Sequence, residues 1–313
     1  MKLGFLYAGQ GSQHVGMGAD LYETYPAFRA VFDGAEVDFD LKERCFTDEA
    51  GLLNQTRYTQ PCMVAFAAGL TAVLKERGIV PHVAAGLSLG EYSALHAAGV
   101  FDAKTAVELV AFRGEAMETS AAGVESAMVA MLGVARDVLQ KACDGAADAG
   151  TVVIANYNCP GQIVIGGEKT AVEKCVALAK GMGAKRCLPL KVSGPFHTPL
   201  MASAGAALTG KFKTTDFGTP AIPVIFNCLG DLKAEGDTIP DLLVRQVQSS
   251  VYMEDSIRKM AAMGVDAIIE IGPGKALSGF VRKTVPEMPV FAVETVTEVE
   301  QLPEWLTALA KEN

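Results

Sequence analysis

The chain has 313 residues, of which 50% are hydrophobic and 20% are charged. This length predicts about two structural units, and the composition excludes both a disordered chain and a charge-rich fibrous one. The formal net charge of −9 argues against the broad cationic surface that binds nucleic acids, so we expect no nucleic-acid partner.

Short β-favouring apolar segments alternate with helical patterns. In chain order, strands are expected at residues 3–8, 83–87, 222–227, 267–271 and 290–293. Continuous apolar segments of this length are typical of strands covered on both faces, as in a parallel α/β sheet. One helix is expected to start at residues 59–61 and to run to Arg77, where Gly78 ends it. Asp102 can cap another helix, which continues through residues 109–117.

The middle of the chain has a different pattern. Between residues 126 and 192 the order is strand, helix, strand, strand, helix, strand, which is the ferredoxin-like βαββαβ unit. We therefore expect an α/β fold with two domains. A large catalytic domain with a wound parallel sheet, residues 1–125 and 193–313, is interrupted by a ferredoxin-like inserted subdomain, residues 126–192.

Cysteine usage and hydropathy indicate where the protein resides. The seven cysteines are odd in number and form no C-x-x-C pair, which favours a reducing cytoplasm over a disulfide framework or a zinc site. The longest apolar run, residues 61–74, is shorter than the roughly 20 residues that cross a bilayer. Residues 1–10 show no signal-peptide pattern. We expect a cytoplasmic protein with no membrane partner, no metal and no cofactor.

The sharpest local signal is Gly86-Leu87-Ser88-Leu89-Gly90, a G-x-S-x-G sequence between an expected strand and a helical stretch. This is the pattern of a nucleophile elbow. Small residues two positions before and after the serine relieve crowding in the turn, and the helix N-terminus favours negative charge that develops there. Ser88 is therefore the candidate nucleophile, with a purely structural turn as the alternative.

A nucleophilic serine needs a base, and the chain has four histidines: His14, His82, His96 and His197. His96 is about 12 Å from Ser88 along the same expected helix, at 1.5 Å per residue, and is too far away. His82 precedes the strand that ends at the elbow, so it belongs at the opposite end of the sheet. His197 lies in a loop that two prolines and a glycine make rigid. It is the preferred base, although His14 could approach and His197 could be an ordinary loop histidine.

Two glycine-rich turns resemble nucleotide-binding loops without completing the patterns. The segment Gly9-Gln10-Gly11-Ser12-Gln13 has His14 where a dinucleotide fingerprint needs its third glycine. The segment Gly272-Pro273-Gly274-Lys275 has Ile269 where a phosphate loop needs its first glycine, and we expect a strand-to-helix turn there. A glycine-flanked turn at a strand end can instead supply a backbone amide to an oxyanion hole.

Six segments carry a resemblance when they are taken together and in order: residues 9–13, 86–94, 112–114, 156–162, 194–197 and 270–275. Together they resemble the malonyl-CoA:acyl carrier protein transacylases of bacterial type II fatty acid synthesis, over essentially the whole chain. The resemblance implies a hydrolase-like parallel-sheet large domain with an inserted ferredoxin-like small domain. It also implies malonyl-CoA and acyl carrier protein as partners. Coenzyme A thioester and phosphopantetheine are then substrate parts rather than cofactors, and we expect a monomer.

The resemblance also implies a role for each site residue. Ser88 would attack the malonyl thioester while His197 takes its proton, and coenzyme A would leave. The backbone amides of Gln10 and Leu89 would hold the oxyanion. The backbone carbonyl of Gln246 would orient His197 in place of an acid. The carrier thiol would then take the malonyl group from the serine, which is ping-pong transfer.

Arg113 lies inside a largely apolar helical stretch. From the residues alone, the simpler interpretation is an arginine paired with a neighbouring carboxylate. The resemblance implies instead that Arg113 binds the free malonyl carboxylate through two parallel hydrogen bonds and so selects malonyl over acetyl. Five basic residues are candidate contacts for an acidic carrier protein, with ordinary solvated charges as the alternative: Lys185, Arg186, Lys191, Arg282 and Lys283.

Two other functions share some of these features. A serine hydrolase of esters or thioesters has the same elbow, but in α/β-hydrolases an acid and then a histidine near the end follow the serine. More than a hundred residues follow His197 here. A patatin-like Ser/Asp enzyme could use Asp144. A non-catalytic scaffold that binds carrier protein predicts decay of the site, whereas the candidate serine, histidine and arginine are all present.

Overall fold

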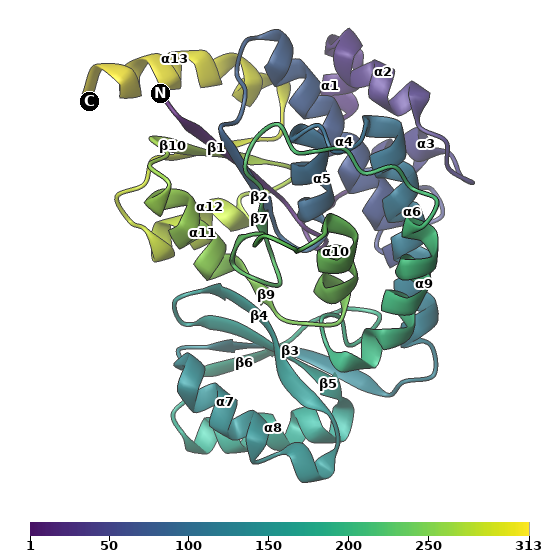
Figure 1. Ribbon diagram of the computed structural model, residues 1–313, viewed down its shortest axis with the longest axis vertical. Helices are drawn as coiled ribbons and strands as arrows, with labels where there is room; N and C mark the ends of the chain where they lie inside the picture. The colour runs from purple at the N-terminus through teal and green to yellow at the C-terminus, as the bar shows by residue number, and fades with distance from the viewer. Residues whose placement is uncertain (313) are drawn as a thin grey trace. The chain divides into compact units, whose positions relative to one another are not determined.

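The computed structural model describes residues 1–312 and divides into two compact units (Figure 1). The first comprises Met1–Gly114, Phe217–Ile225 and the chain from Arg258 onward. The second comprises Glu115–Asp216 and Phe226–Ile257. The second unit therefore contains more of the chain than the segment 126–192, because long-range contacts attach further segments to it.

The first unit is built on a parallel four-stranded sheet with the order β11-β10-β1-β2 (Figure 1). Its strands are β1 Leu3–Tyr7, β2 Val83–Gly86, β10 Ala267–Ile271 and β11 Val290–Val293. The first three of these are buried along their whole length, which explains their continuous apolar sequences. Tyr7 pairs with both Gly86 and Ile271, so three strands end at one edge of the sheet.

The strand expected at residues 222–227 is wrong in its length and in its sheet, because the structure has only a two-residue strand there. Only Val224 bridges to the sheet, at Ala84, and β7 Ile225–Phe226 pairs instead with β8 Asp231–Leu232. Pro223 explains the interruption, because proline cannot donate to a strand ladder. Its carbonyl still accepts a hydrogen bond from the N–H of Ala84.

Helices surround this sheet. They are α1 Ala19–Thr24, α2 Pro26–Gly34, α3 Leu41–Phe46, α4 Thr56–Glu76, α5 Gly90–Ala97, α6 Ala103–Ala121, α11 Met253–Ala262, α12 Ala276–Thr284 and α13 Val296–Glu312. Helix α6 extends past the division at Gly114, and α11 begins before the division at Arg258. Within residues 1–312, none of the helices combines the length and the apolar character that a bilayer span requires.

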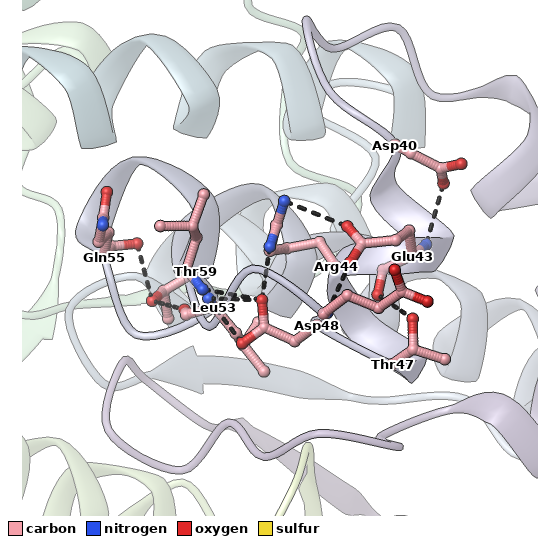
Figure 2. Close-up of polar contacts among 10 residues, drawn as sticks. Asp40, Glu43, Arg44, Thr47, Asp48, Leu53, Gln55 and Thr59 are labelled. Carbon is pink, nitrogen blue, oxygen red and sulfur yellow. Dashed lines mark hydrogen bonds and ion pairs between the residues drawn. The ribbon is translucent and has the colours of Figure 1, made fainter.

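Helix α4 begins at Thr56, earlier than the start expected at residues 59–61, and a buried ion pair holds the turn before it (Figure 2). Arg44 Nη1 donates to Asp48 Oδ1 over 2.5 Å, and Asp48 accepts the N–H of Leu53 over 3.1 Å. Thr59 Oγ1 donates to the Leu53 carbonyl over 2.5 Å. These bonds anchor the turn before α4. The helix therefore has a first turn ahead of Pro61, although proline usually occupies the first helical position.

The second unit contains a five-stranded sheet with the order β6-β3-β5-β4-β9. Its elements are β3 Ser126–Leu132, α7 Arg136–Asp144, η1 Ala147–Ala149, β4 Val152–Cys159, β5 Gln162–Glu168, α8 Lys169–Gly181, β6 Arg186–Pro189, η2 Pro199–Met201, α9 Ala202–Phe212, α10 Ile239–Val247 and β9 Val251–Tyr252. From β3 to β6 the strands and α-helices follow the expected βαββαβ order. Helices α7 and α8 cover one face of the sheet and enclose its core (Figure 1).

The later segment Phe226–Ile257 joins this unit through three kinds of contact. Strand β9 pairs in parallel with β4. The rings of Tyr157 and Tyr252 stack with centroids 5.0 Å apart. Arg136 Nη2 lies 2.8 Å from carboxylate oxygens of both Glu254 and Asp255. Pairing, stacking and charge therefore bind a segment that is distant in sequence to the ferredoxin-like insertion.

Candidate active site

Ser88 occupies the tight turn between β2 and α5. Its φ of 51° lies in the left-handed region, which non-glycine residues rarely adopt and which often marks a functional turn. A Cβ on Gly86 would overlap the Gly90 carbonyl, and a Cβ on Gly90 would overlap the Tyr7 carbonyl oxygen. Both glycines are therefore sterically required, and the turn has the geometry of a nucleophile elbow.

The loop after β1 lies against this elbow. A Cβ on Gly9 would be only 2.5 Å from the Leu87 carbonyl oxygen, so glycine is needed for the two backbones to approach. Gln10 Nε2 donates to Thr56 Oγ1 over 2.9 Å, which anchors the loop to the start of α4. Leu89 is the N-cap residue of α5, where backbone N–H groups lack an intrahelical acceptor. The loops that carry Gln10 and Leu89 therefore meet at the serine.

Arg113, on α6, points its guanidinium at the serine. The residue is 1% exposed, and its Nη2 donates to Ser88 Oγ over 3.1 Å while its Nη1 donates to Gln60 Oε1 over 2.9 Å. Burial lowers the pKa of the Arg113 guanidinium below its ordinary value, and the nearby Tyr92 and Glu91 partly offset this effect. Arginine stays protonated in proteins, so a buried cation lies beside the candidate nucleophile. These two hydrogen bonds run to an amide and a hydroxyl.

Gln60 is a site residue that the sequence analysis did not single out. It is fully buried on α4, one turn after Thr56, so the two residues share a helix face. Thr56 anchors Gln10 and Gln60 anchors Arg113. The sequence signal for Gln60 was a polar amide within an otherwise apolar helix. Because the helix was expected to start only at residues 59–61, the four-residue spacing between Thr56 and Gln60 was not recognised as one helix face.

His197 lies in the second unit, in the loop between β6 and η2. It is 4% exposed, and its φ of 60° is also left-handed. Its Nδ1 is 2.8 Å from the carbonyl oxygen of the buried Gln246 on α10. A carbonyl can only accept, so Nδ1 carries a proton, and the ring in its neutral form would present the lone pair of Nε2. The backbone contact that the resemblance implies is present.

The other three histidines have partners elsewhere. His14 pairs with Glu294, a hydrogen bond that raises the pKa of the imidazole. His82 Nδ1 accepts the N–H of Leu3 over 3.1 Å, at the start of β1 and away from the elbow, as expected. His96 Nδ1 lies 3.1 Å from the Phe101 carbonyl oxygen, and burial lowers the pKa of that ring.

The remaining glycine-rich turn is structural. It connects β10 to α12, and the buried Glu270 accepts the N–H groups of Leu277 and Ser278 at the start of that helix. Burial raises the pKa of the Glu270 carboxyl, and these hydrogen bonds oppose the rise. Across the described residues 1–312, no group of three or more His, Cys, Asp or Glu side chains is placed to hold a metal ion.

Comparisons with known proteins agree on one family. The acyl transferase domain family matches residues 4–307. Malonyl CoA-acyl carrier protein transacylase of Bacillus subtilis is 42% identical over 302 residues, covering 96% of this chain and 95% of that protein. The crystal structure of the enzyme of that name from Clostridium perfringens superposes with a TM-score of 0.96, at 38% identity and with 100% of both chains covered.

One further similar structure is a complex. A malonyl-transacylase bound to a type II polyketide synthase acyl-carrier protein is 35% identical and has a TM-score of 0.93. The match covers 97% of this chain and 99% of that one. The similarity therefore extends over complete chains rather than over a shared domain alone.

Proposed function

We propose that this chain, which belongs to the malonyl-CoA:acyl carrier protein transacylase family, moves the malonyl group from malonyl-CoA to the phosphopantetheine thiol of an acyl carrier protein. The transfer supplies malonyl units for fatty acid biosynthesis. The observation that carries the proposal is the hydrogen bond from the buried Arg113 guanidinium to Ser88 Oγ. A fixed cation beside a nucleophile suits an acyl group that ends in a carboxylate.

In the first half-reaction, Ser88 Oγ attacks the thioester carbonyl carbon and His197 Nε2 takes the serine proton. The tetrahedral oxyanion is held by the backbone amides of Gln10 and Leu89. Collapse of this intermediate breaks the carbon–sulfur bond. Coenzyme A leaves as the thiol after it receives the proton from His197, and the malonyl group stays on Ser88 as an ester.

The second half-reaction reverses these steps with a new thiol. His197 takes the proton of the carrier phosphopantetheine thiol, whose sulfur attacks the malonyl ester. The ester bond breaks, and Ser88 regains its proton from His197. The Nδ1–H bond to the Gln246 carbonyl supports the role of His197 as base, because it orients the ring and stabilises the imidazolium that forms in both halves.

Arg113 would discriminate between acyl groups. Its planar guanidinium can donate two parallel hydrogen bonds to the free malonyl carboxylate. Acetyl-CoA offers no such partner, so the buried cation would gain no counter-ion when acetyl binds. Gln60 supports this assignment, since it holds Nη1 and fixes the plane of the guanidinium.

The remaining parts of the proposal concern the partner and the setting. We propose that the exposed Lys185, Arg186 and Lys191 of the second unit attract the acidic carrier protein, and that Arg282 and Lys283 on α12 also contribute. The steps above use only side chains and backbone amides, without a cofactor. The seven cysteines are all free thiols, which supports a reducing, cytoplasmic setting. A monomer is proposed, and sedimentation would test it.

The test is the intact mass of the protein after brief exposure to malonyl-CoA, followed by addition of buffer or holo acyl carrier protein. We expect a single malonyl adduct that persists in buffer and moves to the carrier. Ser88→Ala should form no adduct, while the control Ser203→Ala, at an exposed serine on α9, should behave as wild type. An adduct lost to water as fast as to the carrier would indicate a hydrolase instead. A protein that forms no adduct would be a carrier-binding scaffold.

A further inference from the structure

The loop that carries His197 is held in a conformation that the chain does not favour by itself. A φ of 60° is rarely adopted by a residue other than glycine, so it persists only where the surrounding structure enforces it. The prolines at positions 195 and 199 restrict their own φ angles but leave the φ of His197 unrestrained. Another group must therefore keep the imidazole in place.

Thr198 is the residue placed to do this. Its side chain is fully buried, and its Oγ1 donates to the Pro195 carbonyl over 2.6 Å. This bond closes a tight turn whose interior contains Phe196 and His197. Thr198 is also the N-cap residue of η2, and its own carbonyl accepts the N–H of Met201 over 3.0 Å. The hydroxyl therefore links the chain before the histidine to the chain after it.

The methyl group of Thr198 packs against the sheet of the same unit, at Gly166. A Cβ on Gly166, in β5, would lie 3.2 Å from Thr198 Cγ2 and 3.3 Å from Met128 Cγ. The φ of Gly166 is outside the left-handed region, so the backbone there would accept alanine without strain. The absence of a side chain at Gly166 therefore leaves room for the methyl group of Thr198.

We propose that Thr198 is the positioning residue of His197. Its hydroxyl closes the turn and its methyl packs on Gly166, and together they hold the imidazole so that Nδ1–H reaches the Gln246 carbonyl. Thr198 does not touch the reacting atoms; it acts through His197. This inference rests on the proposed function, because it assumes that His197 is the base for both thiol exchanges.

Thr198→Val tests the hydroxyl, because valine keeps the shape and removes the donor. We expect the rate constant for acylation of Ser88 by malonyl-CoA to fall by about tenfold or more, as for a displaced catalytic group. The KM for malonyl-CoA should stay unchanged, since Arg113 is untouched. Thr198→Ser keeps the donor and should restore most of the rate. Thr209→Val removes a comparable hydroxyl bond, to the Gly205 carbonyl in α9, and should leave the rate unchanged.

Gly166→Ala tests the contact between the Thr198 methyl group and Gly166, and it leaves the threonine itself unchanged. The added methyl would push Thr198 by a few tenths of an ångström, and we expect an intermediate loss of acylation rate. Loss of rate in Thr198→Val with rescue by serine supports the proposal. Thr198→Val and Gly166→Ala variants that both acylate at the wild-type rate overturn it, as does a loss that serine does not rescue.

A readout independent of turnover separates this inference from the proposed function. With imidazole nitrogens labelled with ¹⁵N, the Nδ1–H signal of His197 should be present in wild type and in Thr198→Ser. It should shift or exchange rapidly in Thr198→Val, because the bond to Gln246 loosens. A wild-type protein without a malonyl adduct would refute the transacylase, while an identical His197 signal in a folded Thr198→Val variant would refute the positioning role alone. Thermal melting of each variant identifies any that fail to fold, in which case Gly166→Ala decides.

Discussion

The Oε1 atom of Gln60 accepts a hydrogen bond from Arg113 Nη1 over 2.9 Å, and this contact fixes the plane of the guanidinium. The other amino group, Nη2, is thereby directed at Ser88 Oγ. A lysine could not be held in this way, because an ammonium has no plane and no second donor in a fixed fork. Two side chains from different helices therefore set the charge beside the candidate nucleophile, Ser88.

We expect Arg113→Ala to lose the preference for malonyl-CoA over acetyl-CoA by on the order of 100-fold or more, because a site built to pair with a carboxylate discriminates strongly. Arg113→Lys should keep the charge and recover only part of the preference, since it lacks the bidentate geometry. The measurement is kcat/KM for both thioesters. An unchanged ratio in the alanine variant would contradict the assigned role.

Gly86→Ala should destabilise the protein by about 3 kcal/mol or more, because the added methyl would overlap the Gly90 carbonyl with no flexible atom to move. Gly279→Ala is the control in the same unit. It lies within α12 with open space around it, so alanine should stabilise by roughly 0.5–1 kcal/mol. Urea denaturation of the three proteins makes the comparison. Equal stability of the two variants would argue against a strained elbow.

The pH dependence of stability should report on Asp48. Burial raises the pKa of this carboxyl, but the hydrogen bonds from Arg44 and from two backbone N–H groups outweigh burial, and the net pKa lies below the ordinary 3.8. The stabilisation from Asp48 is therefore present above that value and is lost as the pH falls through the lowered pKa. Asp48→Asn should cost about 1.5–3 kcal/mol at pH 7 and nothing further in acid.

The control for this experiment is Asp38→Asn. Its carboxylate is 73% exposed in its ion pair with Arg57, so its loss should leave the urea midpoint at pH 7 almost unchanged. If the two variants were equally stable at pH 7, the turn before α4 would not depend on the buried pair.

Charge reversal should test the carrier-binding residues. Lys185→Glu combined with Arg186→Glu is expected to raise the KM for acyl carrier protein several-fold at low salt, with little change in the KM for malonyl-CoA. Lys213→Glu reverses an exposed charge elsewhere in the second unit and serves as the control. The hypothesis fails if both variants show the same KM for the carrier.

The parts of the fold that were predictable follow from short-range patterns. Continuous apolar segments indicated the buried strands, and the spacing of Gly86, Ser88 and Gly90 indicated the elbow, because steric crowding in a turn depends only on neighbouring residues. The βαββαβ order was readable for the same reason. The resemblance supplied Gln246, since nothing in its local sequence distinguishes one helical carbonyl from the next.

The parts that escaped prediction depend on contacts between distant residues. Helix α4 starts at Thr56, after a turn that the Arg44–Asp48 pair holds, rather than at the expected residues 59–61. With this start, Thr56 and Gln60 lie on the same helix face. The segment Phe226–Ile257 belongs to the second unit, where Tyr252 stacks on Tyr157. Hydrophobic periodicity is a property of one helix or strand at a time, so it carries no signal for either relationship.

The group that accepts the Nδ1 hydrogen bond of His197 belongs to the main chain, and this affects how the site can change over generations. Every codon, whatever amino acid it specifies, places a carbonyl at position 246, so no missense mutation can delete that acceptor outright. A peptide carbonyl also does not titrate, whereas a carboxylate in the same place would take up a proton in strong acid. The acceptor of the proposed base therefore survives both single-nucleotide change at that codon and acidification. We expect inactivating variants to accumulate instead at Ser88, at His197 and in the turn between Pro195 and Thr198.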